Sequence, residues 1–317
     1  MSITVVGSIA YDSVKTPFGE RERMLGGAAV HFALAASFFD DVCVVGPVGE
    51  DFGEQQLDVM RRRGIDVSSV EQVPGGNTFF WRGEYGWDLN SRETLDTQLG
   101  VFEGFQPKLS AAALASDVLF LANIQPELQR DVRAQLPDAR FVALDSMNLW
   151  IEIARDQLAA AIGEVDCVIL NDAELRQLTE KPNLVSAARE ILSWSAGGHP
   201  GPSVVVAKQG EYGAALITAE DFFALPAYPL ETVVDPTGAG DTFAGGLVGY
   251  LAAHPGEQVD SELLRRAMAH ATVLASFNVE QFGTERVEQL QGREIAARIG
   301  ELHAMTQFSG EALTLRG

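Results

Sequence analysis

The sequence predicts an α/β domain with a mostly parallel central sheet, helices on both faces of that sheet and a small β lid. Three observations lead to this fold class. The chain has 317 residues and is 46% hydrophobic, so it can bury a large core within one domain. Short apolar runs alternate with helical patterns, which is typical of a parallel sheet covered on both sides. Two turn-rich segments, 13–25 and 77–102, interrupt this alternation.

Buried strands are expected where short runs of Val, Ile, Leu and Ala end at polar residues or glycine. These runs are 3–9, 42–45, 118–122, 141–144, 167–170, 204–207 and 214–217. Helices are expected where apolar residues recur at spacings of three and four. Their ranges are 28–39, 53–63, 186–194, 242–253, 261–277 and 293–305. No linker or internal repeat separates these elements, so we expect a single domain over 1–317.

The interrupting segments 13–25 and 77–102 are expected to form the short strands of the lid. A lid suits an enzyme that must exclude water from a reacting group. Three aromatic residues of the second segment, Trp81, Tyr85 and Trp87, are candidates to stack on a ligand. The alternative is that this aromatic strand packs locally or forms a dimer interface.

The composition is strongly acidic. The formal net charge is −21, and such a field repels a polyanion, so we expect no nucleic-acid partner. No basic segment precedes the first apolar run and no window of 18 uninterrupted apolar residues occurs, so we expect a cytoplasmic protein with no membrane partner. Cys43 and Cys167 lie in apolar runs without metal-type spacing and are expected to be buried thiols.

Residues 235–246 carry the strongest functional signal, Asp-Pro-Thr-Gly-Ala-Gly-Asp-Thr-Phe-Ala-Gly-Gly. Gly238, Ala239 and Gly240 form a turn in which phosphate can approach the main chain. A helical pattern begins here, so the N–H groups of the turn lie at a helix N-terminus and form an anion hole. Asp241 is a candidate general base for phosphoryl transfer, because a carboxylate without such a task would only repel the phosphate. The alternative is an Asp that merely caps the helix.

This twelve-residue segment resembles the second sequence signature of the ribokinase-like, or PfkB, family of carbohydrate and nucleoside kinases. The resemblance extends over most of the chain and implies a ribokinase-like three-layer sandwich, ATP as phosphate donor and a sugar-like acceptor. In proteins similar to this one, the lid often pairs with the lid of another subunit, so a homodimer is expected there. Further matches follow in the family's order at 7–12, 26–27, 48–51, 171–174 and 208–213.

On the acceptor side, Asp12 follows the first predicted strand, and a carboxylate there accepts hydrogen bonds from vicinal hydroxyls; the alternative is a turn cap. Gly26 and Gly27 let the backbone approach the acceptor or let the lid hinge. His31 stands where relatives usually carry Asn, so it is either a hydroxyl ligand or a structural histidine. Further pocket candidates, each with a turn or cap residue as the alternative, are Asn123, Asp145 and Asn148.

On the nucleotide side, Asn171 and Glu174 match the family's Asn-x-x-Glu element, whose Glu helps to order magnesium and water near the phosphates. Outside that context the pair would be a helix cap. Lys208 ends a strand and its point charge suits a phosphate, with pairing to a neighbouring acid as the alternative. The resemblance adds four more nucleotide-side candidates, Gly210, Gly213, His270 and Asn278.

The resemblance also implies two cations. Mg²⁺ is expected with ATP, held through water by Glu174. In some relatives the loops that correspond to Asp235, Thr237 and Gly283 hold a monovalent cation, and this sequence permits K⁺ at Asp235 and Thr237 without demanding it.

The expected activity is transfer of the γ-phosphate of ATP to a hydroxymethyl group of a sugar or sugar-like acceptor, with Asp241 as general base. A nucleoside kinase of the same family is the alternative, because both acceptors present a ribose-type hydroxyl. A non-catalytic sugar or nucleotide sensor with the same pocket is less favoured, since a sensor has no need of the base.

Overall fold

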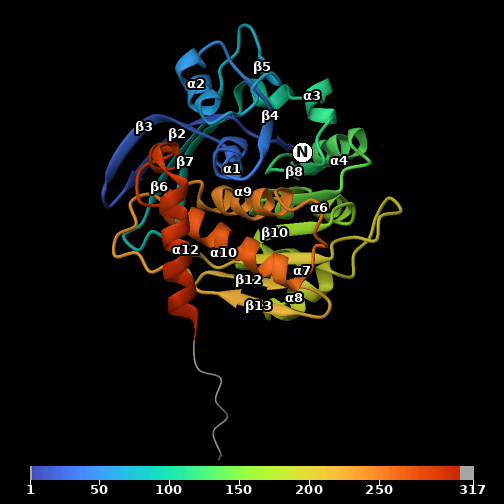
Figure 1. Cartoon of the computed structure of the whole chain (residues 1–317). Coiled ribbons are helices and arrows are strands. Elements are labelled where there is room, and N and C mark those ends of the chain that lie inside the picture. Colours follow the sequence, from blue (N-terminus) through green and yellow to red (C-terminus); the bar gives the residue numbers. More distant parts are fainter. Residues whose placement is uncertain (1, 308–317) are drawn as a thin grey trace, which may run out of the picture.

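A nine-stranded sheet forms the centre of the computed structural model, which describes residues 2–307 (Figure 1). The strand order is β13-β12-β11-β10-β9-β8-β1-β4-β5. The strands are β1 (Ser2–Val6), β4 (Asp41–Val48), β5 (Val70–Gln72), β8 (Val118–Leu121), β9 (Phe141–Asp145), β10 (Cys167–Asn171), β11 (Val204–Lys208), β12 (Ala214–Ile217) and β13 (Phe222–Leu225).

Neighbouring strands are parallel from β5 to β11, as the alternation of strands and helices predicts. Strands β12 and β13 are antiparallel instead. The connection between Lys208 and Ala214 is too short for a crossover helix, so the chain can only turn back on itself. The predicted parallel sheet is therefore confirmed with an antiparallel edge.

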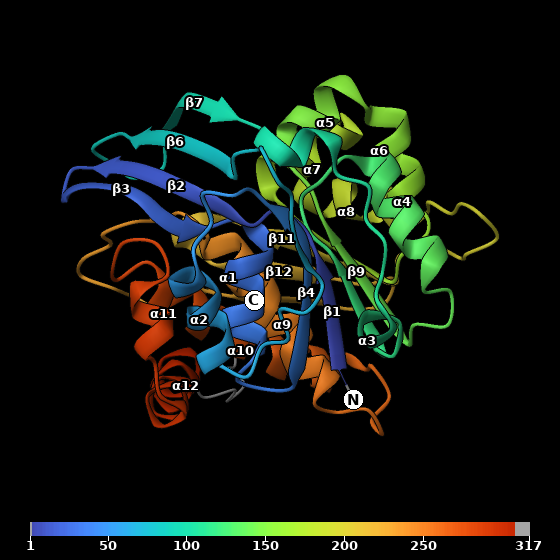
Figure 2. The same ribbon diagram turned by 90° about the horizontal axis from the view of Figure 1, so that it is seen from above.

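A second, four-stranded sheet in the order β3-β2-β6-β7 lies at one side of the central strands (Figure 2). Its strands are β2 (Ala10–Thr16), β3 (Gly19–Gly26), β6 (Phe79–Tyr85) and β7 (Arg92–Gln98). Both segments that interrupt the alternation in the sequence contribute to it. The predicted strand 3–9 was wrong at its end, because β1 stops at Val6 and the chain enters β2 at Ala10.

Helices cover both faces of the central sheet (Figure 2). Alternate strand residues enter two separate cores: Val206 packs with one set of helices and Val205 with the other. The first face carries α1 (Ala28–Ala36), α9 (Ala239–Ala252) and α10 (Ser261–Asn278). The second carries α3 (Ala111–Leu114), α4 (Pro126–Gln135), α5 (Asn148–Ile153), α6 (Arg155–Ile162), α7 (Asp172–Thr179) and α8 (Leu184–Ile191).

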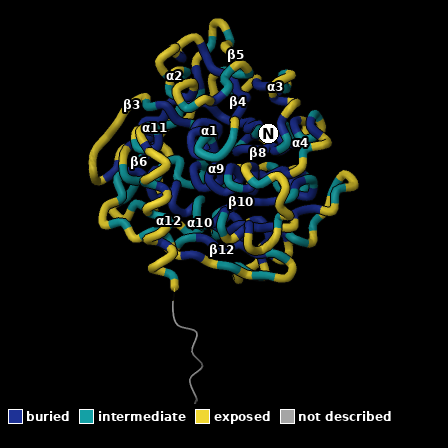
Figure 3. Tube along the Cα trace, viewed as in Figure 1, coloured by how far each residue is buried: buried dark blue, intermediate teal, exposed yellow. Residues whose placement is uncertain are grey.

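The remaining helical elements are α2 (Glu54–Arg62), α11 (Glu285–Gln289), α12 (Gly292–Thr306) and the 3-10 turns η1 (Gly100–Gly104) and η2 (Gly210–Tyr212). Met60 of α2 and Val287 of α11 belong to the core of the first face. The tube coloured by burial shows α1 and α9 enclosed and α12 largely at the surface (Figure 3). Within 2–307, no helix combines the length and the apolar character needed to cross a bilayer.

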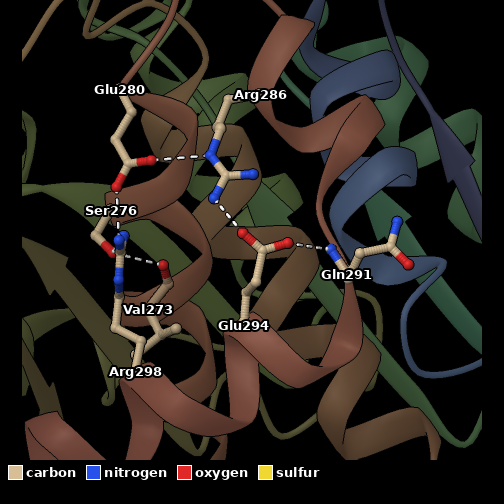
Figure 4. Close-up of polar contacts among 7 residues, drawn as sticks. All are labelled: Val273, Ser276, Glu280, Arg286, Gln291, Glu294 and Arg298. Carbon is tan, nitrogen blue, oxygen red and sulfur yellow. Dashed lines mark hydrogen bonds and ion pairs between the residues drawn. The ribbon is translucent and has the colours of Figure 1, made fainter.

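An ion-pair network ties α12 to the end of α10 (Figure 4). The Glu280 carboxylate forms ion pairs with Arg298 at 2.6 Å and with Arg286 at 2.9 Å. Arg286 also forms an ion pair with Glu294 at 2.6 Å. The network holds the segment that follows α10. That segment contacts Asp235, because Gly283 N donates to the Asp235 carboxylate at 2.9 Å.

Candidate active site

The glycine turn opens α9. Gly238 is the N-cap residue in the left-handed conformation, with φ 74°, and Asp241 is the third residue of the helix. A Cβ on Gly238 would lie 2.3 Å from the His31 ring, so the site requires glycine for its conformation and for its lack of a side chain. Since the N-cap is Gly238, Asp241 lies in the first turn without being the cap residue.

The N–H groups of this turn differ in what they contact. Ala239 N donates to Pro236 O at 3.2 Å, and Thr242 N donates to Gly238 O at 2.8 Å. Within 2–307, the N–H groups of Gly238 and Gly240 have no hydrogen-bond acceptor. A phosphate oxygen at the start of α9 would therefore meet these two donors, and Ala239 N is already engaged.

A partly buried lysine lies beside the turn. Lys208 Nζ is 3.0 Å from Asp145 Oδ2, and a Cβ on Gly240 would lie 3.0 Å from the same ammonium. The sheet explains the proximity: β9, β10 and β11 are parallel and end together, and Lys208 is the register partner of Asn171. Of the two predicted roles for Lys208, pairing with a neighbouring acid is what the structure has, and its ammonium still borders the glycine turn.

Three carboxyl groups surround this lysine, namely Asp145, Glu174 and Asp241. Burial raises the pKa of Glu174 to about 7 and that of Asp145 to about 6, with the Lys208 charge opposing the rise in both. Burial also raises the pKa of Asp241, again against the Lys208 charge. Glu174, with a pKa of about 7, can therefore exchange a proton near neutral pH.

Asn171 and Glu174 form a reciprocal capping box at the start of α7. Asn171 N donates to Glu174 Oε2 at 2.8 Å, and Glu174 N donates to Asn171 Oδ1 at 2.8 Å. The capping role, given above as the alternative, is thus present. It leaves Glu174 Oε1 as an oxygen donor next to Asp145, with which Glu174 interacts electrostatically.

This donor set fits Mg²⁺. Within the described residues, no group of three or more His, Cys, Asp or Glu is arranged to hold a metal ion by itself. Mg²⁺ usually takes one or two carboxylates, with water and substrate phosphate completing its shell. Glu174 and Asp145 are hard oxygen donors whose negative charge a divalent cation would stabilise.

Asp12 lies on the acceptor side, inside β2 rather than after a strand. A Cβ on Gly26 would lie 2.0 Å from Asp12 Oδ2, so Gly26 makes room for the carboxylate. Gly27 caps α1 with φ 96°. Burial raises the pKa of Asp12 to about 7, against a hydrogen bond from the Gly27 backbone, and the charges of Asp235 and Asp241 add to the rise.

Asp235 is fully buried behind the glycine turn. Its two carboxylate oxygens accept the backbone N–H groups of Thr237 and Gly283, each at 2.9 Å. Thr237 O in turn accepts Asn278 Nδ2 at 2.8 Å. The two residues predicted as ligands of a monovalent cation thus lie together, and their role in binding one stays a prediction.

His31 is buried and contacts Asn278. His31 Nδ1 lies 3.2 Å from Asn278 Oδ1, which also accepts Thr242 Oγ1 at 3.0 Å. Because the Asn278 amide nitrogen faces Thr237 O, its oxygen faces His31, so His31 Nδ1 carries the proton. Burial lowers the pKa of His31, so the ring is neutral and its Nε2, which has no partner in 2–307, is an acceptor.

Other predicted residues lie apart from this cluster. Asn123 accepts Trp150 Nε1 at 3.0 Å, and Asn148 is exposed as the first residue of α5. His270 stacks on Tyr250 at 4.2 Å and lies two helical turns before Asn278. Gly210, with φ 57°, is the first residue of η2, and Gly213, with φ 98°, directly follows it, next to the end of β11.

Two residues of the lid, Tyr85 and Arg92, interact with the site in ways that the sequence did not predict. Thr237 Oγ1 donates to Tyr85 Oη at 3.2 Å, which joins the lid to the glycine segment. The positive charge of Arg92 reaches both Asp241 and Glu174. Tyr85 carried an aromatic signal in the sequence, whereas Arg92 lies in a polar strand that gives no signal of its own.

Comparisons with known proteins agree with this geometry. Residues 2–289 match the model of the pfkB family carbohydrate kinases. A cytidine kinase of Thermococcus kodakarensis is 30% identical over 274 residues, which cover 84% of this chain and 95% of that protein. A fructokinase of Klebsiella pneumoniae is 31% identical over 272 residues, covering 80% and 85%.

A solved structure of Burkholderia thailandensis nucleoside kinase in complex with ADP-inosine has the same fold, with a TM-score of 0.76 at 20% identity and 99% coverage of both chains. Its fold is that of the ribokinase-like proteins, as predicted. The family consists of ATP-using kinases that phosphorylate hydroxyl groups. The chain therefore belongs to the pfkB family of carbohydrate kinases and is a phosphotransferase with an alcohol group as acceptor.

Proposed function

We propose that this kinase transfers the γ-phosphate of ATP to the primary hydroxymethyl group of a ribose-type acceptor, with Asp241 as general base. The observation that carries the proposal is the position of Asp241, which is partly buried in the first turn of α9 beside the free N–H groups of the glycine turn. A carboxylate in that place can take a proton from a hydroxyl while the turn holds the phosphate.

In the proposed reaction, the hydroxyl oxygen forms a bond to the γ-phosphorus, the bond to the β,γ-bridging oxygen breaks, and ADP leaves with that electron pair. Asp241 accepts the hydroxyl proton. Lys208 and the Gly238 and Gly240 N–H groups stabilise negative charge on the phosphate oxygens. Mg²⁺ would be held through water by Glu174 and, when bound, supplies charge neutralisation at the β- and γ-phosphates.

A nucleoside is the first candidate acceptor. Supporting this choice, the cytidine kinase relative is matched over 95% of its length. Asp12 would accept hydrogen bonds from the vicinal hydroxyls of the ribose, since its carboxylate lies buried near Asp241. A free sugar is the second candidate, because the fructokinase relative has a comparable identity of 31%, matched over 85% of its length.

The test is an ADP-release assay with ATP and Mg²⁺ across cytidine, inosine, adenosine, ribose, fructose, fructose phosphates, inositols and ketodeoxygluconate. Asp241→Asn should lower turnover by at least ~10²-fold on the active acceptor while ATP binding is retained. Asp260→Asn is the matched control, because Asp260 is an N-cap that accepts Leu263 N at 2.9 Å. It should keep its turnover and nearly all of its stability, because Asn is as good an N-cap as Asp.

The outcomes separate the alternatives. Turnover on a nucleoside that disappears in Asp241→Asn supports the proposal, and turnover only on a sugar selects the second candidate. Unchanged turnover in folded Asp241→Asn would overturn the role of the base. ATP binding with no turnover on any acceptor would favour a sensor.

A further inference from the structure

The hairpin formed by β6 and β7 spans both sides of the active site. Where β6 meets the connecting loop, Tyr85 Oη accepts a hydrogen bond from Thr237 Oγ1 at 3.2 Å, next to the glycine turn. In the loop itself, Asn90 Nδ2 donates to Glu211 Oε1 at 3.2 Å, in the η2 turn that follows β11. The hairpin is therefore docked on the glycine segment and on the nucleotide-side turn at once.

The two faces of the hairpin carry different chemistry. Arg92 is the register partner of Tyr85, so the two side chains share one face. Trp81 supports the guanidinium of Arg92, whose Cζ lies 5.4 Å from the ring centroid. On the other face, Arg82 pairs with Glu20 at 2.8 Å and Glu84 pairs with Lys15 at 2.7 Å. Arg92 thus shares the face that contacts the site, and Arg82 belongs to the outer one.

The charge of Arg92 acts on the catalytic carboxyl groups. Burial raises the pKa of Asp241 and of Glu174, and the positive charge of Arg92 counteracts the rise in both. Among residues 2–307, Arg92 forms no ion pair, although the chain carries a net charge of −21. Lys208, the other cation near these acids, is already bound to Asp145 at 3.0 Å.

Arg92 is exposed on the hairpin, beside Tyr85 at the edge of the site, and has no acidic partner within 2–307. A guanidinium in that place suits an anionic ligand. Guanidinium binds phosphate oxygens through two parallel N–H donors, and charge on the equatorial oxygens must be stabilised during phosphoryl transfer. We propose that Arg92 is a further catalytic residue, supplied by the lid, whose guanidinium binds the γ-phosphoryl group as it passes from ATP to the acceptor.

This inference rests on the proposed function. In the transfer step, the acceptor oxygen bonds to the γ-phosphorus, the bridging oxygen leaves with ADP and the hydroxyl proton goes to Asp241. Arg92 donates hydrogen bonds to an equatorial oxygen throughout and neither gains nor loses a proton. Its contribution belongs to kcat rather than to the KM for the acceptor, because the charge it binds develops on the transferring group.

The experiment compares Arg92→Gln with Arg82→Gln, which removes the same charge from the outer face of the same hairpin. We expect Arg92→Gln to lower kcat by about 10²-fold with little change in the acceptor KM. This is the usual effect of removing one hydrogen-bond donor that stabilises charge in the transition state. Arg82→Gln should stay within about 2-fold of the wild type. Added guanidinium should restore part of the kcat of Arg92→Ala, which a purely structural role of Arg92 would not allow.

A second readout does not depend on turnover. Binding of ADP with aluminium fluoride, which imitates the transferring phosphoryl group, should weaken about 10²-fold in Arg92→Gln while binding of ADP alone is kept. Equal kcat in Arg92→Gln and Arg82→Gln would overturn the inference, and so would failure of guanidinium to act on Arg92→Ala. If Asp241→Asn abolishes turnover and Arg92→Gln does not, only the role of Arg92 fails. If Asp241→Asn keeps turnover, the proposed function itself fails.

Discussion

Lys208 and Asp145 form a partly buried ion pair, with 3.0 Å between Nζ and Oδ2, where the ends of β9 and β11 meet the first turn of α9. Burial by itself lowers the pKa of Lys208, yet the charges of Asp145, Glu174 and Asp241 outweigh it and raise that pKa. One ammonium is therefore shared by three acids. Its charge opposes the rise that burial causes in the pKa of the proposed base.

Lys208→Met should move the activity profile to higher pH. Without the ammonium, Asp241 loses the main charge that opposes the rise in its pKa, so it is protonated over a wider range. We expect kcat at pH 7 to fall at least ~10-fold and to recover in part toward pH 9. Exposed Lys181→Met is the control and should leave the pH–rate profile unchanged. A Lys208→Met profile that coincides with the wild type would contradict the coupling.

Asp12→Asn should stabilise the protein relative to the wild type as pH rises. Burial raises the pKa of Asp12 from 3.8 to about 7, so between these values the folded state binds more protons than the unfolded state. The unfolding free energy of the wild type therefore decreases as pH rises from about 4 to about 7, because the proton that Asp12 binds in the folded state is lost. The decrease is complete above pH 7. Three pKa units correspond to about 4 kcal/mol as an upper limit.

The measurement is the difference in unfolding free energy between Asp12→Asn and the wild type at pH 4 and at pH 8. Any packing cost of the Asn amide contributes equally to this difference at pH 4 and at pH 8. It therefore cancels when the two differences are compared. Exposed Asp41→Asn serves as the control. A difference that does not change between pH 4 and pH 8 would show that Asp12 is ionised like an ordinary surface acid.

Much of the fold could be predicted because it depends on local patterns. The strand 214–217 was predicted with its observed bounds, and every predicted helix is present. The antiparallel direction of that strand could not be predicted from its apolar run, since pairing direction depends on the short connection before it. The start of α9 at Ala239, three residues before the predicted start, follows from glycines that carry no helical signal.

The site was predictable where the chemistry lies within one segment. The glycine turn and Asp241 are contiguous, and Asn171 and Glu174 are three residues apart. Contacts between distant segments could not be obtained from periodicity. Arg92 reaches Asp241 only because the two sheets are brought together, and the Asn278 side chain fixes the His31 tautomer across 247 residues of chain.

Gly238→Ala should be more harmful than its backbone conformation alone implies. Gly238 and Gly64 have nearly the same φ, 74° and 73°, but a Cβ on Gly238 would lie 2.3 Å from His31 whereas a Cβ on Gly64 would have nothing within 4 Å. Gly64→Ala therefore measures the strain of a left-handed residue, about 1 kcal/mol. Gly238→Ala adds the clash with a buried ring.

We expect Gly238→Ala to lose at least ~2 kcal/mol of unfolding free energy and to bind ATP more weakly, because the N–H donors of the turn must shift. Gly64→Ala should bind ATP normally. Urea unfolding and ATP titration of both variants give the comparison. Equal losses in the two variants would mean that the turn at Gly238 relaxes away from His31 without consequence.

Glu280→Gln should destabilise the C-terminal part of the molecule. Glu280 lies between Arg286 and Arg298, and all three side chains are less than a quarter exposed. Removing the carboxylate leaves two partly buried guanidinium groups with less compensation, so we expect a loss of about 2 kcal/mol in urea unfolding. Glu54→Gln removes the partner of Arg61 in an exposed pair and should change stability by less than about 0.5 kcal/mol.

The same change should reach the glycine segment, because the network holds the loop whose Gly283 N binds the Asp235 carboxylate. We therefore expect faster hydrogen exchange at Gly283 and Thr237 in Glu280→Gln, and unchanged exchange there in Glu54→Gln. If Glu280→Gln is destabilised but hydrogen exchange at Gly283 is not faster, the network anchors α12 and does not hold the loop at Gly283. No destabilisation at all would show that water replaces the carboxylate between the two arginines.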